Sequence, residues 1–409
     1  MSRASSSHAH KFSEDADYDF EIRTVLGLSS EGASDIGEVL AATAGIKKGD
    51  HKAWLEAWRT LAQRTLDTAD ASASAGRRVS AAEAYLRASV YFGVAVNAIS
   101  ATDDLTALVP TFATQQAAWD SFVDHSATDI ERVAIPYESS TLPGYFLRPR
   151  ANANGRTIIA VNGSDGSTAA LWAVCASPAL KRGYNVLLFD GPGQQSQLFE
   201  HNVPFRPDWE NVLTPVFDFV AGVDGVNEDR IAVYGISQGG YWVPRALAFE
   251  HRFAAAIADP GVVDVSTSWT AHIPKSLMKL LDEKEEAKFD NQMRMGMKFS
   301  SETANTWRFR ARPYGMSGYA ETVEAVRTYN LEAHAAKITT PIFVTDPEDE
   351  QFWPGQSERL AELTSSVSTL SHFTAAEGAS GHCQPLARDL TAQRMFDWLD
   401  EHFDSLEAR

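Results

Sequence analysis

The chain has 409 residues, 44% of them hydrophobic, and a formal net charge of −18 that arises from 36 basic against 54 acidic residues. This balance excludes partners that require clustered positive charge, namely nucleic acid and an anionic membrane surface. Two cysteines, Cys175 and Cys383, are too few for a disulfide framework, and the sequence contains no CxxC metal pattern. We therefore expect a small-molecule substrate, neutral or cationic, and neither a metal nor another cofactor.

The sequence shows no targeting or membrane segment. Residues 1–20, MSRASSSHAHKFSEDADYDF, lack the apolar core of a signal peptide. No stretch approaches the roughly eighteen apolar residues of a transmembrane helix. The expected location is the cytoplasm, away from membranes.

Helical patterns fill residues 1–130. Trp54 and Trp58 begin an apolar stripe with helical spacing. Further on, Ser80 stands three residues before Glu83, which is the pattern of a capping box at the start of another helix. Residues 1–130 are therefore predicted to form an N-terminal helical cap domain.

From residue 131 the pattern changes to short β-rich runs that alternate with helical runs. Several of the β-rich runs are continuously apolar, as a parallel sheet covered on both faces requires. Residues 131–409 are therefore predicted to form an α/β core with a mostly parallel, doubly wound sheet. The predicted strands are 132–137, 144–148, 157–161, 185–189, 231–234, 255–258, 341–345 and 370–373.

Residues 262–340 interrupt this core. They are mostly helical in pattern and rich in charge, and they are too long for a plain crossover connection. We predict a helical lid insertion over one end of the sheet.

One motif within the core carries chemistry. Residues 235–239, Gly-Ile-Ser-Gln-Gly, fit G-x-S-x-G, the nucleophile elbow of α/β-hydrolases. An elbow serine lies on a sharp turn between a strand and a helix, where side chains at the glycine positions would clash. The predicted strand 231–234 precedes the motif and an apolar helix from Tyr241 follows it. This context predicts Ser237 as a nucleophile, and the alternative is a turn without chemistry.

The acid of a catalytic triad is expected in the loop after the predicted strand 341–345, because this fold orders its triad as serine, acid, histidine. The loop offers Asp346, Glu348, Asp349 and Glu350. In the commonest form of this loop the acid lies three residues after a turn glycine and four before a proline. Pro347 occupies the position of the turn glycine, three residues before Glu350, and Pro354 lies four residues after Glu350. Both spacings therefore select Glu350. Asp349 is the second candidate.

The histidine of the triad is predicted at His382. It lies in the small-residue loop that follows the last predicted strand and precedes the C-terminal helix. Serine hydrolases need a histidine there, with one ring nitrogen on the acid and the other on the serine. His372 falls within the predicted strand and is the wrong place.

The oxyanion hole is expected to use two backbone N–H groups. One belongs to Gln238, at the start of the helix that follows the nucleophile. The second is expected in the small-residue loop after strand 157–161, at Ser164 or Gly163. Four aromatic side chains are predicted to line an apolar substrate pocket: Tyr241, Trp172, Phe352 and Trp353.

These motifs together resemble a known family. The segments DRIAVYGISQGGYWVPRALA, FDGPGQ, PEDEQFWPGQS and EGASGHCQ are similar to those of the α/β-hydrolases that include 2,6-dihydroxypseudooxynicotine hydrolase and the fungal heptaketide-shortening hydrolases. The N-terminal segment from Leu26 to Arg64 is also similar to the helical cap of that group. The resemblance implies a serine hydrolase, often a homodimer, and several members cut a carbon–carbon bond beside a ketone. This chain departs from the family pattern in the acid loop, because relatives place Asp at the position that Glu350 occupies here.

The predicted function is hydrolysis of a small aromatic or polyketide-like ketone, at a carbon–carbon bond, or of an ester. Ser237 attacks the carbonyl, His382 takes the proton of the serine hydroxyl, and Glu350 orients the imidazole of His382. The alternatives are a general carboxylesterase, an aminopeptidase, and a binding protein with an inactive triad. No acidic anchor for the amine of a peptidase substrate is recognisable in the sequence.

Overall fold

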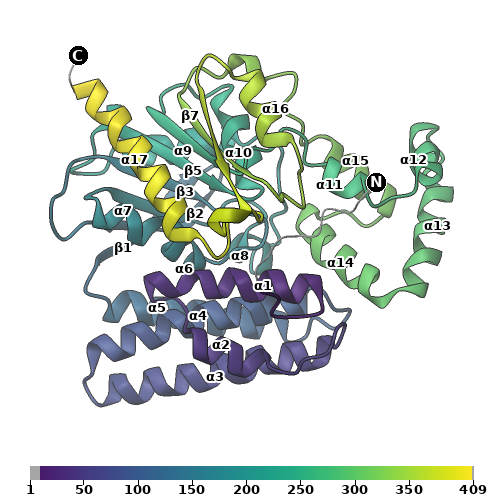
Figure 1. Cartoon of the computed structure of the whole chain (residues 1–409), viewed down its shortest axis with the longest axis horizontal. Coiled ribbons are helices and arrows are strands. Elements are labelled where there is room, and N and C mark those ends of the chain that lie inside the picture. The colour runs from purple at the N-terminus through teal and green to yellow at the C-terminus, as the bar shows by residue number, and fades with distance from the viewer. Residues whose placement is uncertain (1–9, 408–409) are drawn as a thin grey trace.

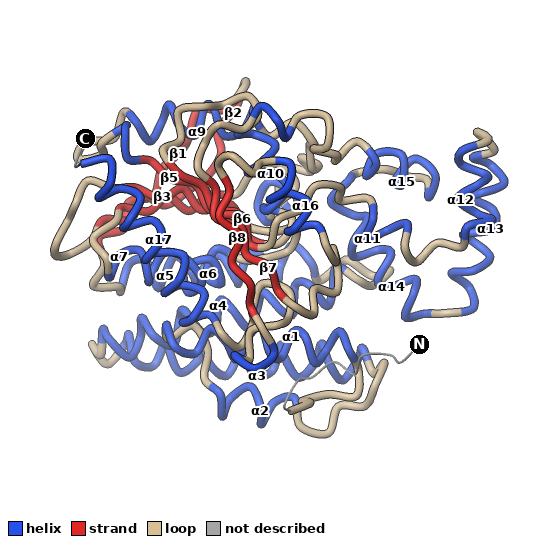
Figure 2. Tube along the Cα trace, turned by 45° about the horizontal axis from the view of Figure 1, so that its top comes forward, coloured by secondary structure: helices blue, strands red, loops and turns tan. Residues whose placement is uncertain are grey.

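A computed structural model describes residues 10–407. Residues 1–9, which belong to the stretch predicted to lack a signal peptide, lie outside the described residues. An eight-stranded sheet forms its centre (Figures 1 and 2). The strands are β1 (Asp129–Tyr137), β2 (Ser140–Arg148), β3 (Thr157–Val161), β4 (Asn185–Phe189), β5 (Ile231–Ile236), β6 (Ala255–Asp259), β7 (Ile342–Pro347) and β8 (Ser368–Phe373). Each predicted strand has a counterpart here, with ends that differ by a few residues.

The strand order is β1-β2-β4-β3-β5-β6-β7-β8. The strands from β4 to β8 along this order pair in parallel, whereas β2 pairs antiparallel with both β1 and β4. Every residue of β3, β4 and β6 is buried, as expected for strands covered on both faces. The predicted α/β-hydrolase fold with a mostly parallel sheet is confirmed.

Helices cover both faces of the sheet (Figure 2). Alternate side chains of one strand point to opposite faces, so Ile158 and Ile159 of β3 belong to different hydrophobic clusters. The cluster of Ile158 includes residues of α17 (Arg388–Glu407), and that of Ile159 includes residues of α9 (Glu210–Ala221) and α10 (Gly239–Leu247). No helix within residues 10–407 is long and apolar enough to cross a lipid bilayer.

Five helices precede the sheet and lie together below it in Figure 1. They are α1 (Ala16–Gly27), α2 (Ile36–Thr43), α3 (His51–Ser74), α4 (Arg78–Ser100) and α5 (Leu108–His125). Most of α4 is buried, and its residues share one hydrophobic cluster with β3 and α17. The N-terminal helices are therefore packed onto the core rather than tethered beside it.

The predicted capping box at Ser80 and Glu83 is wrong. Helix α4 begins at Arg78, and its N-cap Arg77 makes no side-chain capping bond. Helix α3 continues to Ser74, and the chain reverses at Gly76. The φ of Gly76 is +69°, in the left-handed region that glycine adopts without strain. Ser80 therefore lies inside the first turn of α4, where it cannot act as the cap.

Helices α11 (Thr267–Thr270), α12 (Lys275–Asp282), α13 (Glu286–Phe299), α14 (Ser301–Ala311) and α15 (Tyr319–Arg327) lie between β6 and β7. They project to the right of the sheet in Figure 1. Just after α14, the Arg312 guanidinium donates to the Ser100 hydroxyl at 3.0 Å and to the Ser100 carbonyl at 2.8 Å. This contact joins the inserted helices to the end of α4.

Candidate active site

Ser237 lies on the turn between β5 and α10. Its φ is +55°, and its amide donates to the Asp259 carbonyl at 2.6 Å. A Cβ at Gly235 would overlap the Gly239 carbonyl, and a Cβ at Gly239 would lie 3.0 Å from the Val161 carbonyl oxygen. Few side chains tolerate a positive φ, so this geometry is the strained turn that a nucleophile elbow requires.

The side chains of Ser237, His382 and Glu350 form a continuous hydrogen-bonded chain. His382 Nε2 lies 2.9 Å from Ser237 Oγ. His382 Nδ1 lies 2.8 Å from Glu350 Oε2 and 3.0 Å from Oε1. These three residues come from the loops after β5, β8 and β7, which meet at one edge of the sheet because the strands are parallel.

The acid loop distinguishes Glu350 from its neighbours. Glu350 Oε1 also accepts the amides of Phe352 at 2.8 Å and Trp353 at 3.1 Å, which fix its carboxylate against His382. Asp349 Oδ2 is buried without a hydrogen-bond partner among the described residues. Asp346 instead contacts His372 at 2.6 Å, on the adjacent strands β7 and β8.

Burial and charge act in opposite directions on the pair of Glu350 and His382. Burial alone would raise the pKa of Glu350, but His382 and the two backbone amides lower that pKa below its ordinary value. Burial would likewise lower the pKa of His382, but Cys383 and Glu350 raise it well above the usual range. Burial raises the pKa of the Cys383 thiol, so that this group is neutral near pH 7. The negative charge that stabilises the His382 imidazolium is therefore that of the Glu350 carboxylate.

The backbone amides of Gln238 and Ser164, near Ser237, have no acceptor among residues 10–407. The Gly163 amide, in contrast, donates to the Asn162 side chain at 2.9 Å. A Cβ at Gly163 would lie 2.9 Å from Ser237 Cβ, so the two loops approach each other closely. Of the two residues predicted for the second oxyanion donor, Ser164 therefore has the available N–H group.

A cavity of about 280 Å³ opens onto Ser237 and His382. Its wall combines three parts of the chain: the N-terminal helices α1, α3 and α4, the core loops, and the inserted helices α11 and α14. Phe352, Trp353 and Phe20 line it, and their rings lie 4.7, 5.7 and 6.2 Å from the His382 ring. Much of the wall around the imidazole is therefore aromatic.

Two of the four predicted pocket residues lie elsewhere. Trp172 is buried in the core, where its ring meets Phe122 edge to face at 5.0 Å. Tyr241 is buried on the first turn of α10, and its hydroxyl donates to the Pro207 carbonyl at 3.1 Å. Both side chains point into packed protein, so the structure does not bring them to this cavity as the sequence predicts.

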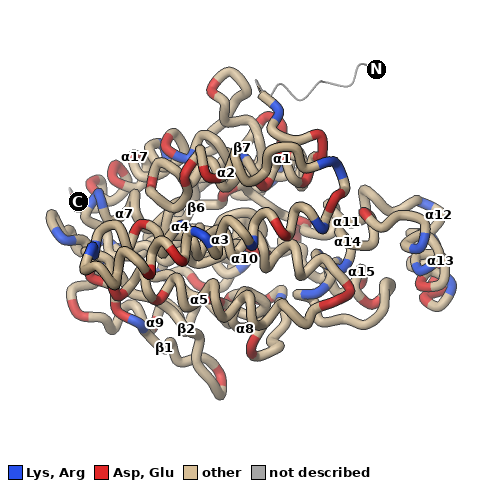
Figure 3. Tube along the Cα trace, turned by 90° about the horizontal axis from the view of Figure 1, so that it is seen from below, with Lys and Arg blue, Asp and Glu red and all other residues tan. Residues whose placement is uncertain are grey.

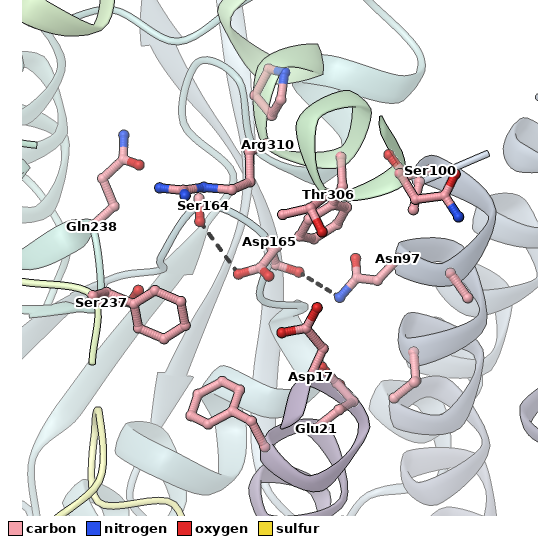
Figure 4. Close-up of a pocket in the computed structure, with 18 of the residues that line it drawn as sticks. Asp17, Glu21, Asn97, Ser100, Ser164, Asp165, Ser237, Gln238, Thr306 and Arg310 are labelled. Atoms are coloured by element: carbon pink, nitrogen blue, oxygen red, sulfur yellow. Dashed lines mark hydrogen bonds between the residues drawn. The ribbon is translucent and has the colours of Figure 1, made fainter. Parts of the chain in front are cut away.

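Several polar side chains on the cavity wall are not among the predicted site residues. Asp17 and Glu21 from α1, Asp165 from the loop after β3, and Arg310 from α14 line the cavity together with Asn97 (Figure 4). No acidic anchor for a substrate amine was expected, yet three carboxyl groups face the same space as Ser237. Their spacing along the chain carries no motif, because distant segments supply these residues.

The described residues show no metal centre. No group of three or more His, Cys, Asp or Glu side chains within residues 10–407 is arranged to hold a metal ion. Cys175 and Cys383 are both buried free thiols.

Comparisons with known proteins agree with the fold. A model of the prolyl oligopeptidase family matches residues 174–299. The chain is 30% identical to "Hydrolase LUC6" of Fusarium sp over 94% of its length and 96% of that protein. It is 29% identical to "Alpha/beta hydrolase xenA" of Xenoacremonium sinensis, covering 96% and 98% of the two chains.

The crystal structure of 2,6-dihydroxy-pseudo-oxynicotine hydrolase shares the fold across nearly the whole chain. The TM-score is 0.70 at 18% identity, and the match covers 92% of this chain and 94% of that structure. The chain belongs to the α/β-hydrolase family, within the group of fungal hydrolases that includes LUC6. The predicted resemblance is confirmed, N-terminal helices included.

Proposed function

We propose that this hydrolase works through a serine triad of Ser237, His382 and Glu350. The observation that carries the proposal is the chain of contacts from Ser237 Oγ to His382 at 2.9 Å and from His382 to Glu350 at 2.8 Å. Hydrogen bonds of this length allow the imidazole to take the serine proton while the carboxylate stabilises the positive charge. Asp349, the second candidate for the acid, lacks the contact with His382 that this role needs.

In the proposed reaction, Ser237 Oγ adds to a substrate carbonyl and His382 takes the proton of the Ser237 hydroxyl. The carbonyl oxygen becomes negative and accepts hydrogen bonds from the amides of Gln238 and Ser164. The intermediate then collapses, the bond to the leaving group breaks, and His382 returns the proton to that group. Water, activated by His382, releases the acid from the acyl-enzyme.

We propose a small aromatic or polyketide-like ketone as substrate, cleaved at a carbon–carbon bond. The enclosed, largely aromatic wall around His382 supports this choice, because a carbanion-like leaving group must be shielded from water until it is protonated on carbon. An ester would use the same residues with an alkoxide as leaving group. General carboxylesterase activity is therefore the second candidate.

Two measurements test the chemistry. A fluorophosphonate probe should label the wild-type protein at Ser237 and leave Ser237→Ala unlabelled. Aryl ketones and 1,3-diketones should then be compared with p-nitrophenyl esters of the same acyl groups, with products identified by mass. Ester cleavage with every ketone at background would refute carbon–carbon hydrolysis and leave a carboxylesterase, whereas no labelling would contradict the serine mechanism.

We also propose that residues 1–130 act as a cap domain and residues 262–340 as a lid on a 131–409 core. The lining of the cavity by α1, α4 and α14 supports this division, since these helices close the space above Ser237. A cytoplasmic homodimer stays a prediction from the sequence. Light scattering after gel filtration would test the dimer, and cell fractionation would test the location.

A further inference from the structure

A second, smaller cavity meets the first one at Ser237. Its volume is about 150 Å³, and Ser237 and His382 line both cavities. The polar residues Glu21, Asn97 and Asp165 also line both, so they lie where the two cavities meet. The wall that belongs to the smaller cavity alone comes from α1, α4 and residues 162–174, and it includes the aliphatic residues Val25, Leu28, Val90, Ala170, Leu171 and Val174. We call this smaller cavity the aliphatic lobe.

Polar side chains on the wall of the aliphatic lobe are bonded within the protein. The Thr24 hydroxyl donates to the Phe20 carbonyl at 2.9 Å, and the Ser167 hydroxyl accepts the Ala170 amide at 3.1 Å. The Asn162 side-chain amide donates to the Ser167 carbonyl at 3.1 Å. A ligand that enters the lobe therefore meets mainly apolar surface, and an apolar group gains free energy by leaving water there.

Helix α4 brings no charge to this lobe. Acidic and basic residues are scattered over the surface helices (Figure 3), but the stretch of α4 from Ala88 to Ser100 contains none. Val90, Gly93 and Val94 from this stretch line the lobe. The part of α4 that faces the lobe thus suits an uncharged occupant.

Gly93 keeps the lobe open. It lies inside α4, where glycine stabilises a helix less than alanine does. A Cβ at this position would meet Ser167 at 3.6 Å and Gln115 at 3.8 Å, which is ordinary van der Waals contact. Neither close packing nor a positive φ therefore requires glycine here. The missing side chain instead leaves space in the lobe.

The volume of the lobe limits what can enter it. An apolar protein cavity of about 150 Å³ holds one benzene ring. The aliphatic lobe has this volume, so it accommodates a group of about six carbons. The larger cavity, at about 280 Å³, has room for a bigger part of the substrate.

The surroundings of His382 and Ser237 assign the two sides of the substrate. Phe352 and Trp353, whose rings lie 4.7 and 5.7 Å from the His382 ring, line only the larger cavity. The leaving group receives its proton from His382, so this cavity suits the leaving group. The acyl part stays bonded to Ser237 and needs space beside the serine turn. Gly163, where an added Cβ would lie 2.9 Å from Ser237 Cβ, lines only the aliphatic lobe.

We propose that the aliphatic lobe is the acyl subsite, and that Gly93 sets the length of the acyl group that it accepts. This inference rests on the proposed serine chemistry at Ser237 and adds a substrate class: a carbonyl compound with a short apolar acyl side of about six carbons or one aromatic ring, and a larger leaving group. The acid released from Ser237 is then the smaller of the two products.

The test varies the acyl side of p-nitrophenyl esters in steps of two carbons from acetate to decanoate. We expect kcat/KM to rise about fourfold for each methylene up to hexanoate and to rise no further beyond it, because each buried methylene contributes equally until the lobe is full. Gly93→Leu fills the lobe and should reduce the ratio of hexanoate to acetate at least about tenfold. Gly93→Ala, whose methyl group fits without strain, should reduce this ratio about fourfold. The control Gly296→Leu, at an exposed position of α13, should leave the ratio unchanged.

The opposite change enlarges the lobe. Val90→Ala removes two methyl-sized groups from its wall, so kcat/KM should continue to rise to octanoate. A chain-length profile that neither Val90→Ala nor the two Gly93 variants alter overturns the proposal.

A second series varies the leaving group at constant acyl group. It compares p-nitrophenyl acetate with the larger 4-nitro-1-naphthyl acetate. Gly93→Leu should leave the ratio of these two esters unchanged. A change in this ratio instead of the hexanoate-to-acetate ratio would place the leaving group in the lobe and overturn the assignment.

Binding separates this inference from the serine chemistry. Calorimetry with Ser237→Ala measures the affinity for the 4-nitroanilides of acetic and hexanoic acid without turnover. Tighter binding of the hexanoyl compound, lost when Gly93→Leu is added, supports the acyl subsite even if Ser237 is not the nucleophile. Equal affinities for the two compounds, or a preference that Gly93→Leu does not change, overturn it.

Discussion

Arg388 and Asp259 form a buried ion pair, with Nη1 3.0 Å from Oδ2 and side-chain exposures of 6% and 0%. Arg388 also donates to the Cys383 carbonyl at 2.6 Å, next to His382 in the chain. The Asp259 carbonyl accepts the amide of Ser237 at 2.6 Å. One ion pair therefore ties the backbone of the serine turn to that of the histidine loop.

Replacing Arg388 by Met should leave the Asp259 carboxylate buried without a counter-charge. We expect the free energy of unfolding to fall by about 3–5 kcal/mol, because breaking a buried pair leaves an uncompensated charge. Urea denaturation followed by fluorescence measures this. The control Arg132→Met removes ion pairs with Asp120 and Asp124 in which Arg132 is 46% exposed, and it should cost at most about 1 kcal/mol. Equal losses in the two variants would contradict the importance of the buried pair.

Replacing Ser237 by Ala should abolish turnover of activated esters. We expect kcat/KM to fall by at least about 10³-fold, because the nucleophile is lost while the rest of the site stays in place. Circular dichroism should show an unchanged fold. Ser317→Ala, at an exposed position on the inserted segment, is the matched control and should retain activity. Near-normal activity of Ser237→Ala would remove the basis of the serine mechanism.

The candidate reacting groups were predictable because local rules fix them. A Cβ at Gly235 would overlap the Gly239 carbonyl within the same turn, and Glu350 and His382 follow strands whose order is visible in the sequence. The polar wall of the cavity was not predictable, since Glu21 and Arg310 come from helices that only the tertiary packing brings together.

The aromatic residues show the same limit. Phe352 and Trp353 line the cavity because they follow Glu350 directly in the acid loop. Tyr241 also lies only four residues from Ser237, and Trp172 lies eight residues from Ser164, but each is on a helix whose apolar face packs into the core. Sequence distance from a candidate catalytic residue does not determine which way a helical side chain points.

Glu350→Gln should reduce activity far more than Asp349→Asn. The substituted amide would keep the shape of the side chain but lose the charge that orients and stabilises the His382 imidazolium, whereas Asp349 makes no contact with His382. We expect the loss in kcat for Glu350→Gln to exceed that for Asp349→Asn by at least about tenfold. Steady-state kinetics on one ester compares the two variants. The opposite ranking would assign the acid to Asp349.

Gly163→Ala should slow the reaction by moving the loop that carries the Ser164 amide. The added methyl group would lie 2.9 Å from Ser237 Cβ, so one of the two loops must shift. We expect kcat to fall by about 10- to 100-fold through a misplaced oxyanion donor. The control Gly296→Ala meets nothing within 4 Å on α13 and should leave kcat unchanged. An equally small effect of both substitutions would argue against a close oxyanion loop.

The pH profile should report the titration of His382. Only the neutral imidazole accepts the Ser237 proton, so kcat/KM should fall as the pH drops through the pKa of His382. Because the Glu350 carboxylate raises that pKa against the effect of burial, the acidic limb should lie above the ordinary histidine value of about 6.5. Glu350→Gln removes the negative charge that stabilises the imidazolium, and the limb of its residual activity should therefore move to lower pH. The measurement is kcat/KM for a neutral p-nitrophenyl ester between about pH 5 and 9, with Asp349→Asn as the control. A limb that stays in place in Glu350→Gln would show that this carboxylate does not set the charge of His382.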